Sequence, residues 1–453
     1  MQLIETGRQR QLSLAVLGLL GAAGAPVRAA DDPLPTQFDS GLLYYQEGDS
    51  RVKDLEAVIN VRQPLAADRA WSGRILLDSV CGGSPNGAIP SHNQQTFATP
   101  SSTSLTPTTA VVQTTTSASG GGGGGGSISL CNNPVVGGVY TVAPGQLPID
   151  QSFHDQRIAV SGGYETALAS DTKLGLGAAY SHEFDFASTS LNASIAQDFD
   201  AHNTTLSLGV NVEGDDVHAV GGTPVPWSQY NLFEKGGSQR KRVHDLLLGL
   251  TQVMNRRWLA QWNVSLERAS GYLNDPYKIV TEVDAQGNDA AGAYVYENRP
   301  GTRNRTVFYW DNKVDLDYAV AQLSWRHQTD SWHIRSDTLD LHLRVPLGEA
   351  GYIEPHWRGY RQSAADFFHF FLFQGSPASG FASADPRLAA FTGRTVGLKY
   401  GLPMGKSGEF SVRVERYVQH GSSPANVPVG LQGLDLLPDL RASIVQAGLR
   451  FEF

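Results

Sequence analysis

Apolar and polar residues alternate along many segments of this chain, each about ten residues long, the length of a strand that crosses an outer membrane. In the stretch "DTLDLHLRVPL" at 337–347, Leu339 and Leu341 lie on one face, and Asp340 and His342 lie on the other. A period of two residues predicts a β-strand rather than a helix. In a membrane barrel the apolar face meets lipid and the polar face lines the lumen.

We place about sixteen such strands, within a range of 14 to 18, and predict an all-β fold. The predicted architecture is a transmembrane antiparallel β-barrel with long extracellular loops and short periplasmic turns. The strands are expected at 38–46, 51–64, 70–80, 155–169, 172–184, 188–199, 203–214, 241–254, 257–268, 304–315, 318–328, 333–346, 351–362, 391–402, 409–420 and 442–453.

The lengths of the connections support this count. Bacterial barrels keep both termini in the periplasm, so the connections after odd-numbered strands are extracellular and long. The long segments 81–154, 215–240, 269–303, 363–390 and 421–441 all follow odd-numbered strands. The apolar run "FFHFFLF" at 367–373 is awkward, because another crossing would reverse the last strand. We expect this run to extend the thirteenth strand or to belong to a loop folded over the pore.

The chain closes on the alternating stretch "ASIVQAGLRFEF", whose apolar face includes Val445, Leu449, Phe451 and Phe453. A soluble protein seldom leaves such a strand at an edge, because the unpaired backbone invites aggregation. In a closed barrel the last strand pairs with the first. We expect these four residues to lie in that strand and to act as the C-terminal signal for the barrel-assembly machinery.

The first residues are typical of a secretory signal peptide. Two arginines precede the apolar run "LSLAVLGLLGAAGAP", and "VRA" at 27–29 supplies a cleavage site of small residues. An amphipathic helix is the alternative, but no polar stripe interrupts the run. Beyond residue 30 no apolar stretch reaches the roughly eighteen residues of a membrane helix. We therefore expect a signal peptide at 1–29 and a barrel at 30–453, located in the bacterial outer membrane.

The composition fits an exported barrel. The chain is 41% hydrophobic and 17% charged, and it contains 49 Gly and three Met. This is not the composition of a helical or α/β enzyme. A formal net charge of -9 without a Lys/Arg cluster argues against a nucleic-acid partner. The partners we expect are outer-membrane lipid and the barrel-assembly machinery. No residue pattern indicates an oligomeric state.

The segment 82–153 is a low-complexity extracellular loop, rich in Thr, Ser and Gly, that cannot bury a core of its own. Cys81 and Cys131 flank most of it. In a chain exported to an oxidising compartment a disulfide is expected, with two inert thiols as the alternative. The seven glycines from Gly120 to Gly126 lack the strand, helix and following lysine of a phosphate-binding loop.

The twelfth and thirteenth strands are predicted to turn six polar residues into the lumen. One register of this antiparallel pair sets Arg344 near Glu354, His342 near His356 and Asp340 near Arg358, and a shift of two residues sets His342 opposite Glu354. The ladder has two interpretations. Two imidazoles can share a transition metal or sense pH, or the ladder is a polar wall that fixes the register. We favour the wall and assign no metal, because a metal site needs a third ligand that the spacing does not fix.

A site at the outer rim of the barrel is the other candidate, with Tyr360, Arg361 and Asp366 in "YRQSAADFF". The same residues can also serve only to shape the loop. No compact arrangement of Ser, His and an acid stands out, although Ser363 and His369 are near each other in sequence. We therefore expect no enzymatic activity and no cofactor.

Several short motifs resemble a known family. "CGGSPNGA" at 81–88, "GYLNDPYKIV" at 271–280, "ENRPGTRNR" at 297–305, "EPHWRGYRQSAADFF" at 354–368 and the closing "LRFEF" are similar to a family of Gram-negative outer-membrane barrels described as a domain of unknown function. Cys81 stands where members more often have Ser. The resemblance implies a redox or metal-handling setting, since members tend to be encoded near thioredoxin-like and flavin-transferase-like proteins.

These features predict a passive role. We expect a porin-like conduit for small solutes across the outer membrane. The alternative is a plugged barrel that serves as the outer-membrane scaffold of an envelope assembly with redox or metal-handling partners. An open lumen with ion conductance distinguishes the first from the second.

Overall fold

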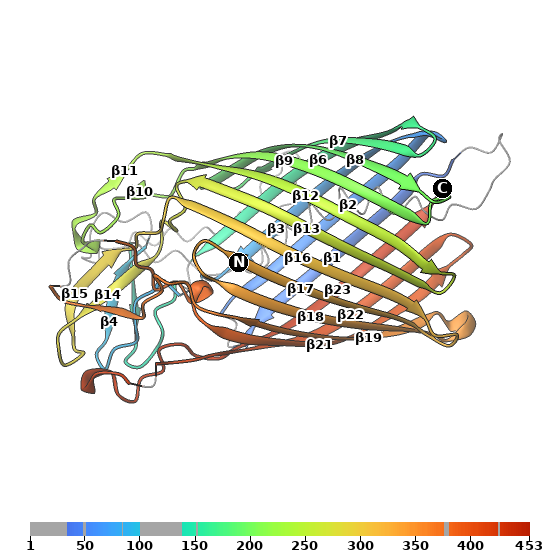
Figure 1. Cartoon of the computed structure of the whole chain (residues 1–453). Coiled ribbons are helices and arrows are strands. Elements are labelled where there is room, and N and C mark those ends of the chain that lie inside the picture. The colour runs from blue at the N-terminus through green and yellow to red at the C-terminus, as the bar shows by residue number, and fades with distance from the viewer. Residues whose placement is uncertain are drawn as a thin grey trace, which may run out of the picture.

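The computed structural model describes residues 34–48, 51–83, 85–99, 138–150, 153–375, 380–424 and 426–453. Sixteen strands form one closed barrel in chain order, and the last strand pairs with the first (Figure 1). The predicted fold class is confirmed. The barrel strands are β1 (Gln37–Glu47), β2 (Lys53–Ala66), β3 (Arg69–Cys81), β6 (His154–Ala169), β7 (Thr172–His182), β8 (Phe186–Phe199), β9 (Thr204–Val217), β12 (Gln239–Asn255), β13 (Trp258–Gly271), β16 (Thr302–Asp315), β17 (Val320–Asp330), β18 (Arg335–Pro346), β19 (Tyr352–Gln362), β21 (Phe391–Met404), β22 (Gly408–Gly421) and β23 (Leu440–Glu452).

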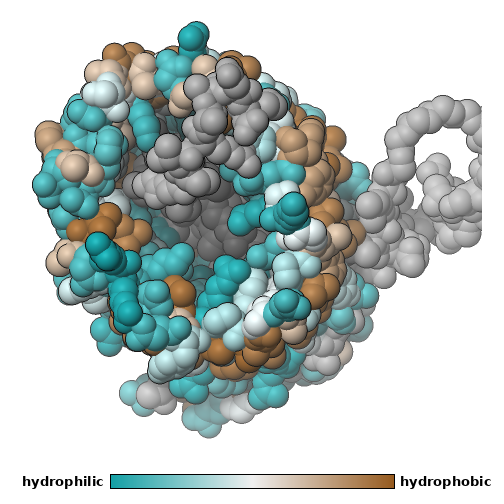
Figure 2. Space-filling view, turned by 90° about the vertical axis from the view of Figure 1, so that its right-hand side faces the viewer, coloured by the Kyte–Doolittle hydropathy of each residue, from teal (hydrophilic) through white to brown (hydrophobic). Residues whose placement is uncertain are grey.

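The barrel wall has an apolar outer face and a polar inner face. In β18 the exposed fraction of Leu341 is 42%, whereas that of the preceding Asp340 is 7%. In β19 Trp357 is 37% exposed, and the preceding His356 is 5% exposed. The apolar side chains therefore point outward and the polar ones pack inside, which is the arrangement of a barrel whose outer wall faces lipid. Figure 2 looks into the barrel at the end where the C-terminus lies and shows a hollow surrounded mostly by hydrophilic residues.

The seam between β1 and β23 closes the barrel. Phe38 stands opposite Phe451, and their rings stack with centroids 4.7 Å apart. In the same strand pair, Nε of Arg450 donates to Oδ1 of Asp39 at 2.5 Å. The apolar last strand is thus paired rather than left as an edge, which removes the risk of aggregation.

The long connections gather at one end of the barrel and fold into a cap (Figure 1). They follow β3, β9, β13, β19 and β22, and short turns join the strands at the other end. The cap contains the hairpin of β4 (Gln95–Ala98) and β5 (Val139–Val142), the pair β10 (Thr223–Pro224) and β11 (Lys235–Gly236), and a sheet of β15 (Asp289–Tyr296), β14 (Ile279–Val283) and β20 (Phe371–Phe373). It also contains the 3-10 turns η2 (Tyr230–Leu232), η4 (Pro386–Leu388) and η5 (Val429–Leu431); η3 (Gly348–Ala350) lies between β18 and β19.

The cap buries apolar side chains that several loops supply together. Phe97 of β4 is fully buried in a cluster with Tyr230, Ile279 and Tyr294, which belong to two other connections. The sequence predicted that 82–153 buries no core of its own, yet its two ends fold. They do so because the hairpin β4–β5 packs on apolar residues of neighbouring loops. The run at 367–373 also belongs to the cap, where β20 pairs in parallel with β14.

Within the described residues, no helix is both long and apolar enough to cross a bilayer. The predicted signal peptide at 1–29, the glycine run at 120–126 and Cys131 lie outside the described residues. The predictions made for them stay predictions.

Candidate functional site in the lumen and the cap

The polar ladder predicted from the sequence lies on the inner face of β18 and β19. The register places His342 opposite His356 and Asp340 opposite Arg358, which is the first of the two registers considered above. The two imidazole rings stack almost in parallel, with centroids 4.1 Å apart and an angle of 5° between their planes. Both rings direct Nε2 at Asp340.

The carboxylate of Asp340 lies between the two histidines and an arginine. Its Oδ1 is 2.8 Å from Nε2 of His342 and 3.0 Å from Nε2 of His356. Its Oδ2 accepts a hydrogen bond from Nε of Arg358 at 2.5 Å. One buried acidic side chain thus joins three basic ones.

The other nitrogen of each ring contacts a second carboxylate. Nδ1 of His342 is 3.2 Å from Oε1 of Glu354, and Nδ1 of His356 is 2.6 Å from Oε1 of Glu415. Arg413 contacts both glutamates, at 2.8 Å and 3.3 Å respectively. A carboxylate only accepts hydrogen bonds, so each ring makes both of its contacts as a donor only in its cationic form.

A glycine allows Glu415 to reach His356 across an intervening strand. Gly397 of β21 stands opposite His356 on one side and opposite Glu415 on the other. A Cβ atom on Gly397 would lie 2.6 Å from Cγ of Glu415, well inside van der Waals contact. The absence of a side chain at this position opens the path between β19 and β22.

The ladder changes partners near the turn at 347–351. Pro355 has no N–H, and the pairing of β18 with β19 is interrupted beside it. Arg344 was placed near Glu354 in one register, but its guanidinium lies 3.6 Å from the ring centre of Tyr352 and 3.5 Å from Glu409. The predicted ladder is therefore kept at His342 with His356 and at Asp340 with Arg358, and it is lost at Arg344.

The three outer-rim candidates lie apart. Tyr360 and Arg361 are neighbours in β19, so their side chains point to opposite faces of the wall. Arg361 is paired with Asp337 at 3.0 Å, and its side chain is 75% exposed. Asp366 lies in the following loop, where Oδ2 is 2.6 Å from Nδ1 of His333. The described residues form no common site at this rim, and its role stays a prediction.

The remaining predicted residues are structural. Cys81 ends β3 and takes part in a disulfide; because Cys131 lies outside the described residues, the proposed pairing stays a prediction. Of the four C-terminal signal residues, Val445, Leu449 and Phe451 lie in β23. Phe453 follows the strand. Recognition of this strand by the assembly machinery also stays a prediction.

A second charged cluster, which the sequence analysis missed, lies inside the cap. We call it the cap ion cluster. It joins the connection after β13 to the connection after β19, and its members are Asp275, Lys278, Glu297, Arg299, Asp385 and Arg387. Three carboxylates face three cations, so the cluster is formally neutral.

The contacts of this cluster cross from loop to loop. Nη2 of Arg299 is 2.8 Å from Oδ2 of Asp385, and Nε of the same arginine is 2.7 Å from Oε1 of Glu297. Nη2 of Arg387 is 2.5 Å from Oδ2 of Asp275. Nζ of Lys278 donates to the carbonyl oxygen of Pro85 at 2.5 Å, which ties in the connection after β3.

Burial and ion pairing shift the pKa values of these groups in opposite directions. Burial alone would raise the pKa of Asp385, but Arg387 and Arg299 outweigh it and hold the pKa well below its usual range. Burial raises the pKa of Glu297 in spite of the charge of Arg299. Burial lowers the pKa of Lys278. The two arginines therefore maintain the charge of Asp385 in a place that disfavours charge.

One sequence signal could have revealed this cluster. "NDPYK" at 274–278 and "SADPR" at 383–387 both place an aspartate before a proline and a cation two or three residues after the aspartate. Such a loop pattern marks a rigid turn with paired charges. The pattern cannot show which two loops meet.

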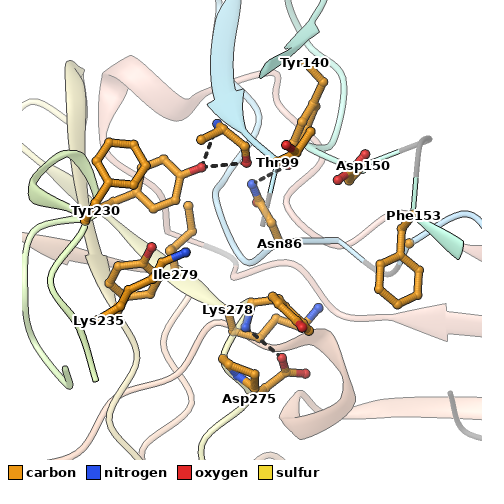
Figure 3. A pocket seen from close by; sticks show the side chains of 16 residues that line it. Asn86, Thr99, Tyr140, Asp150, Phe153, Tyr230, Lys235, Asp275, Lys278 and Ile279 are labelled. Carbon is orange, nitrogen blue, oxygen red and sulfur yellow. Dashed lines mark hydrogen bonds between the residues drawn. The ribbon is translucent and has the colours of Figure 1, made fainter. Parts of the chain in front are cut away.

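A pocket separates this cluster from the aromatic core of the cap (Figure 3). Its volume is about 80 Å³, and Tyr140, Tyr230, Lys235 and Tyr296 are among its lining residues. The hydroxyl of Tyr230 donates to the carbonyl of Ala98 at 3.0 Å. Burial raises the pKa of Tyr296 to about 12, so this hydroxyl stays neutral. The pocket has room for water molecules or a small organic group.

Comparison with solved structures finds outer-membrane barrels. The siderophore receptor PirA from Acinetobacter baumannii matches with a TM-score of 0.40 and 9% identity, over 87% of this chain and 54% of the receptor. A mutant of the ferric enterobactin receptor PfeA from Pseudomonas aeruginosa matches with a TM-score of 0.39 and 9% identity, over 86% of this chain and 55% of that one. A bacterial polysaccharide outer membrane secretin matches with a TM-score of 0.43 and 8% identity, over 93% of this chain and 100% of the other.

The chain thus spans just over half the length of the two receptors. Among curated proteins, none matches the sequence. A family model matches nearly the whole chain, residues 9–451, and its description is "Protein of unknown function (DUF3570)". The chain therefore belongs to the DUF3570 family, in agreement with the resemblance of its motifs.

Proposed function

We propose that this outer-membrane-type barrel is a porin-like, passive conduit for small hydrophilic solutes. The observation that carries the proposal is the polar hollow seen at the end of the barrel that holds the short turns (Figure 2). Charges of both signs pair along its wall, as in Arg62 with Glu165 at 3.0 Å and Arg157 with Asp78 at 2.9 Å. Such a wall supports water-filled passage without strong selectivity for one sign of ion.

The cap limits what such a conduit can pass. It is a folded body with apolar clusters and a buried ion cluster, not a set of separate loops. A solute that enters from outside must move around or through it. We therefore expect passage of small solutes and exclusion of larger ones.

A plugged barrel that acts as the scaffold of an envelope assembly is the second candidate. The folded cap favours this candidate, because a rigid cover over the outer mouth suits a closed lumen. In that case the outer loops or the periplasmic turns hold the partners, and we propose redox proteins of the envelope for this role.

Single-channel recording of the refolded mature protein in a planar bilayer tests the first proposal. We expect steady current steps that scale with the salt concentration, and swelling of proteoliposomes in small sugars but not in large ones. Electrical silence of a barrel that keeps the gel shift of a folded outer-membrane protein would overturn the conduit. A variant with a loosened cap, Arg387→Met, then separates the candidates: current that appears only in this variant identifies the cap as a plug.

A further inference from the structure

Three donor atoms converge at the centre of the lumen ladder. They are Nε2 of His342, Nε2 of His356 and Oδ1 of Asp340, and each nitrogen lies within 3.0 Å of the oxygen. With metal bonds of about 2.0 Å, two ligands of a tetrahedral ion lie about 3.3 Å apart. Each of the two nitrogen–oxygen distances therefore needs to widen by only a few tenths of an ångström for both atoms to bind one ion, and all three donor atoms lie within 4.8 Å of one another.

We propose that Asp340, His342 and His356 bind one divalent transition-metal ion, with Zn²⁺ as the representative species. The two stacked rings turn their Nε2 atoms to the same side. Two imidazoles and one carboxylate are a ligand set for zinc and its first-row neighbours rather than for calcium or magnesium, which prefer oxygen ligands.

The atoms behind the ligands have the arrangement of a built metal site. In such sites the second nitrogen of each histidine donates to a carboxylate, a backbone carbonyl or a water molecule, which fixes the ring and its tautomer. Glu354 holds Nδ1 of His342, and Glu415 holds Nδ1 of His356. This leaves Nε2 of each ring as the atom that faces the ion.

Two arginines complete this support. Arg358 binds Oδ2 of Asp340 and leaves Oδ1 directed at the histidines. Arg413 contacts both supporting glutamates and holds them in place. With both rings cationic, the carboxylates of Asp340, Glu354 and Glu415 face two imidazoliums and two guanidiniums, so the group carries a formal charge of +1 before the ion binds. A divalent ion brings the same charge as the two Nε2 protons that it displaces.

The site has room for exchange with the lumen. The side chain of His342 is 25% exposed, whereas that of His356 is only 4% exposed. Three protein ligands leave one position of a tetrahedral ion for water, as in zinc sites that are not purely structural. The ion would therefore enter and leave through the lumen, and binding does not depend on whether the barrel conducts.

Metal binding to the mature barrel, purified without a histidine tag and treated with chelator, tests the proposal. Calorimetric titration with Zn²⁺ is expected to show one strong site per chain. Glu415→Gln removes a supporting carboxylate and is expected to weaken Zn²⁺ binding by about 10- to 100-fold. His342→Asn and His356→Asn each remove a ligand and are expected to weaken binding at least as much.

The chain offers a matched control. Nδ1 of His327 is 2.9 Å from Oδ1 of Asp337, so it has the same contact with a carboxylate but lies outside the three-donor group. His327→Asn is expected to leave the strong site unchanged. Absence of a strong Zn²⁺ site in the wild type, or a site that survives both His342→Asn and His356→Asn, would overturn the proposal.

A spectroscopic measurement keeps the test decisive if the histidine variants do not fold. Co²⁺ in a four-coordinate site with two imidazoles absorbs visible light far more strongly than six-coordinate Co²⁺ in water. We expect the wild type to develop this absorption at one equivalent of Co²⁺ and to lose it when Zn²⁺ is added. A wild-type spectrum that stays that of aqueous Co²⁺ contradicts the proposal without any variant.

Discussion

The guanidinium of Arg387, in the connection after β19, lies 2.5 Å from the carboxylate of Asp275, in the connection after β13. The same guanidinium also pairs with Asp385, whose side chain is fully buried. One cation therefore pairs with carboxylates from two loops. Without Arg387, three carboxylates of the cap ion cluster would face only two cations, and a buried carboxylate in excess of its partners is strongly unfavourable.

Arg387→Met is therefore expected to destabilise the cap by about 3–5 kcal/mol, the usual cost of breaking a buried ion pair on one side. Thermolysin cleavage within 272–301 and 363–390 measures this loss, since the protease cuts loops that open. Arg361→Met is the control, because the side chain of Arg361 is 75% exposed. Equal cleavage rates for the two variants would show that the cap does not rest on this ion pair.

A pH dependence is expected at the edge of the cap next to β7. Burial and the charge of Asp155 raise the pKa of Glu183 from 4.5 to about 8. Between these two pH values the folded state keeps a proton on Glu183 that the unfolded state has lost. The stability that Glu183 contributes is therefore full below pH 4.5 and is lost as the pH rises through about 8. Nearby, the hydroxyl of Tyr277 donates to Asp185 at 2.5 Å. We expect this attachment to loosen above pH 8.

Hydrogen exchange of the segment around Tyr277 at pH 7 and pH 9, corrected for the intrinsic rate, measures this effect. Glu183→Gln removes the ionisation and is expected to keep the segment protected at pH 9. Glu234→Gln, at an exposed carboxylate in the cap, is expected to behave like the wild type. Equal protection at both pH values in the wild type contradicts the prediction.

The barrel was predictable because its signals are local. Alternation within each strand fixes which face is apolar, and the length of each connection fixes the end at which it lies. The same reasoning left two registers for β18 and β19 across the short turn at 347–351, and the structure has the one that sets His342 opposite His356. Each of these features depends on residues close together in sequence.

The contacts that matter most for the candidate sites are not local. Glu415 reaches His356 only because Gly397 stands between them, and that relation depends on the order of three strands. The cap core likewise joins Phe97 to Tyr230 and Ile279 from separate connections. The sequence of any one connection does not show which other connections pack against it, so it does not predict this shared core.

The shared core of the cap gives a third prediction. Phe97 is fully buried, and its ring centroid lies 5.2 Å from that of Tyr294 and 5.5 Å from that of Tyr140. Phe97→Ala is expected to destabilise the cap by about 3–5 kcal/mol, through lost apolar contact and an unfilled cavity. Thermolysin cleavage of 85–99 measures it. Phe381→Ala, at a residue that is 48% exposed, is expected to have little effect, and similar cleavage of both variants would contradict a core at Phe97.

The last prediction links the glycine of β21 to the lumen ladder. In Gly397→Ala the new Cβ would lie 2.6 Å from Cγ and 2.9 Å from Oε1 of Glu415. The glutamate must then swing away, and Nδ1 of His356 loses the acceptor that orients the ring. We expect Zn²⁺ to bind about 10- to 100-fold more weakly, as for loss of any carboxylate behind a metal-binding histidine. Crowding is also expected to lower the free energy of unfolding of the barrel by about 1–3 kcal/mol.

Calorimetric titration with Zn²⁺ and urea unfolding in micelles measure these two effects separately. Gly209→Ala is the matched control: it is a strand glycine whose added Cβ would meet only Cβ of Leu247, at 3.8 Å, an ordinary contact. Gly397→Ala that loses stability but keeps full Zn²⁺ affinity would show that Glu415 does not position His356. Suppose that both effects appear together in Gly397→Ala and that Gly209→Ala shows neither. The lack of a side chain at Gly397 is then what lets Glu415 of β22 reach His356 of β19 and orient it for metal binding.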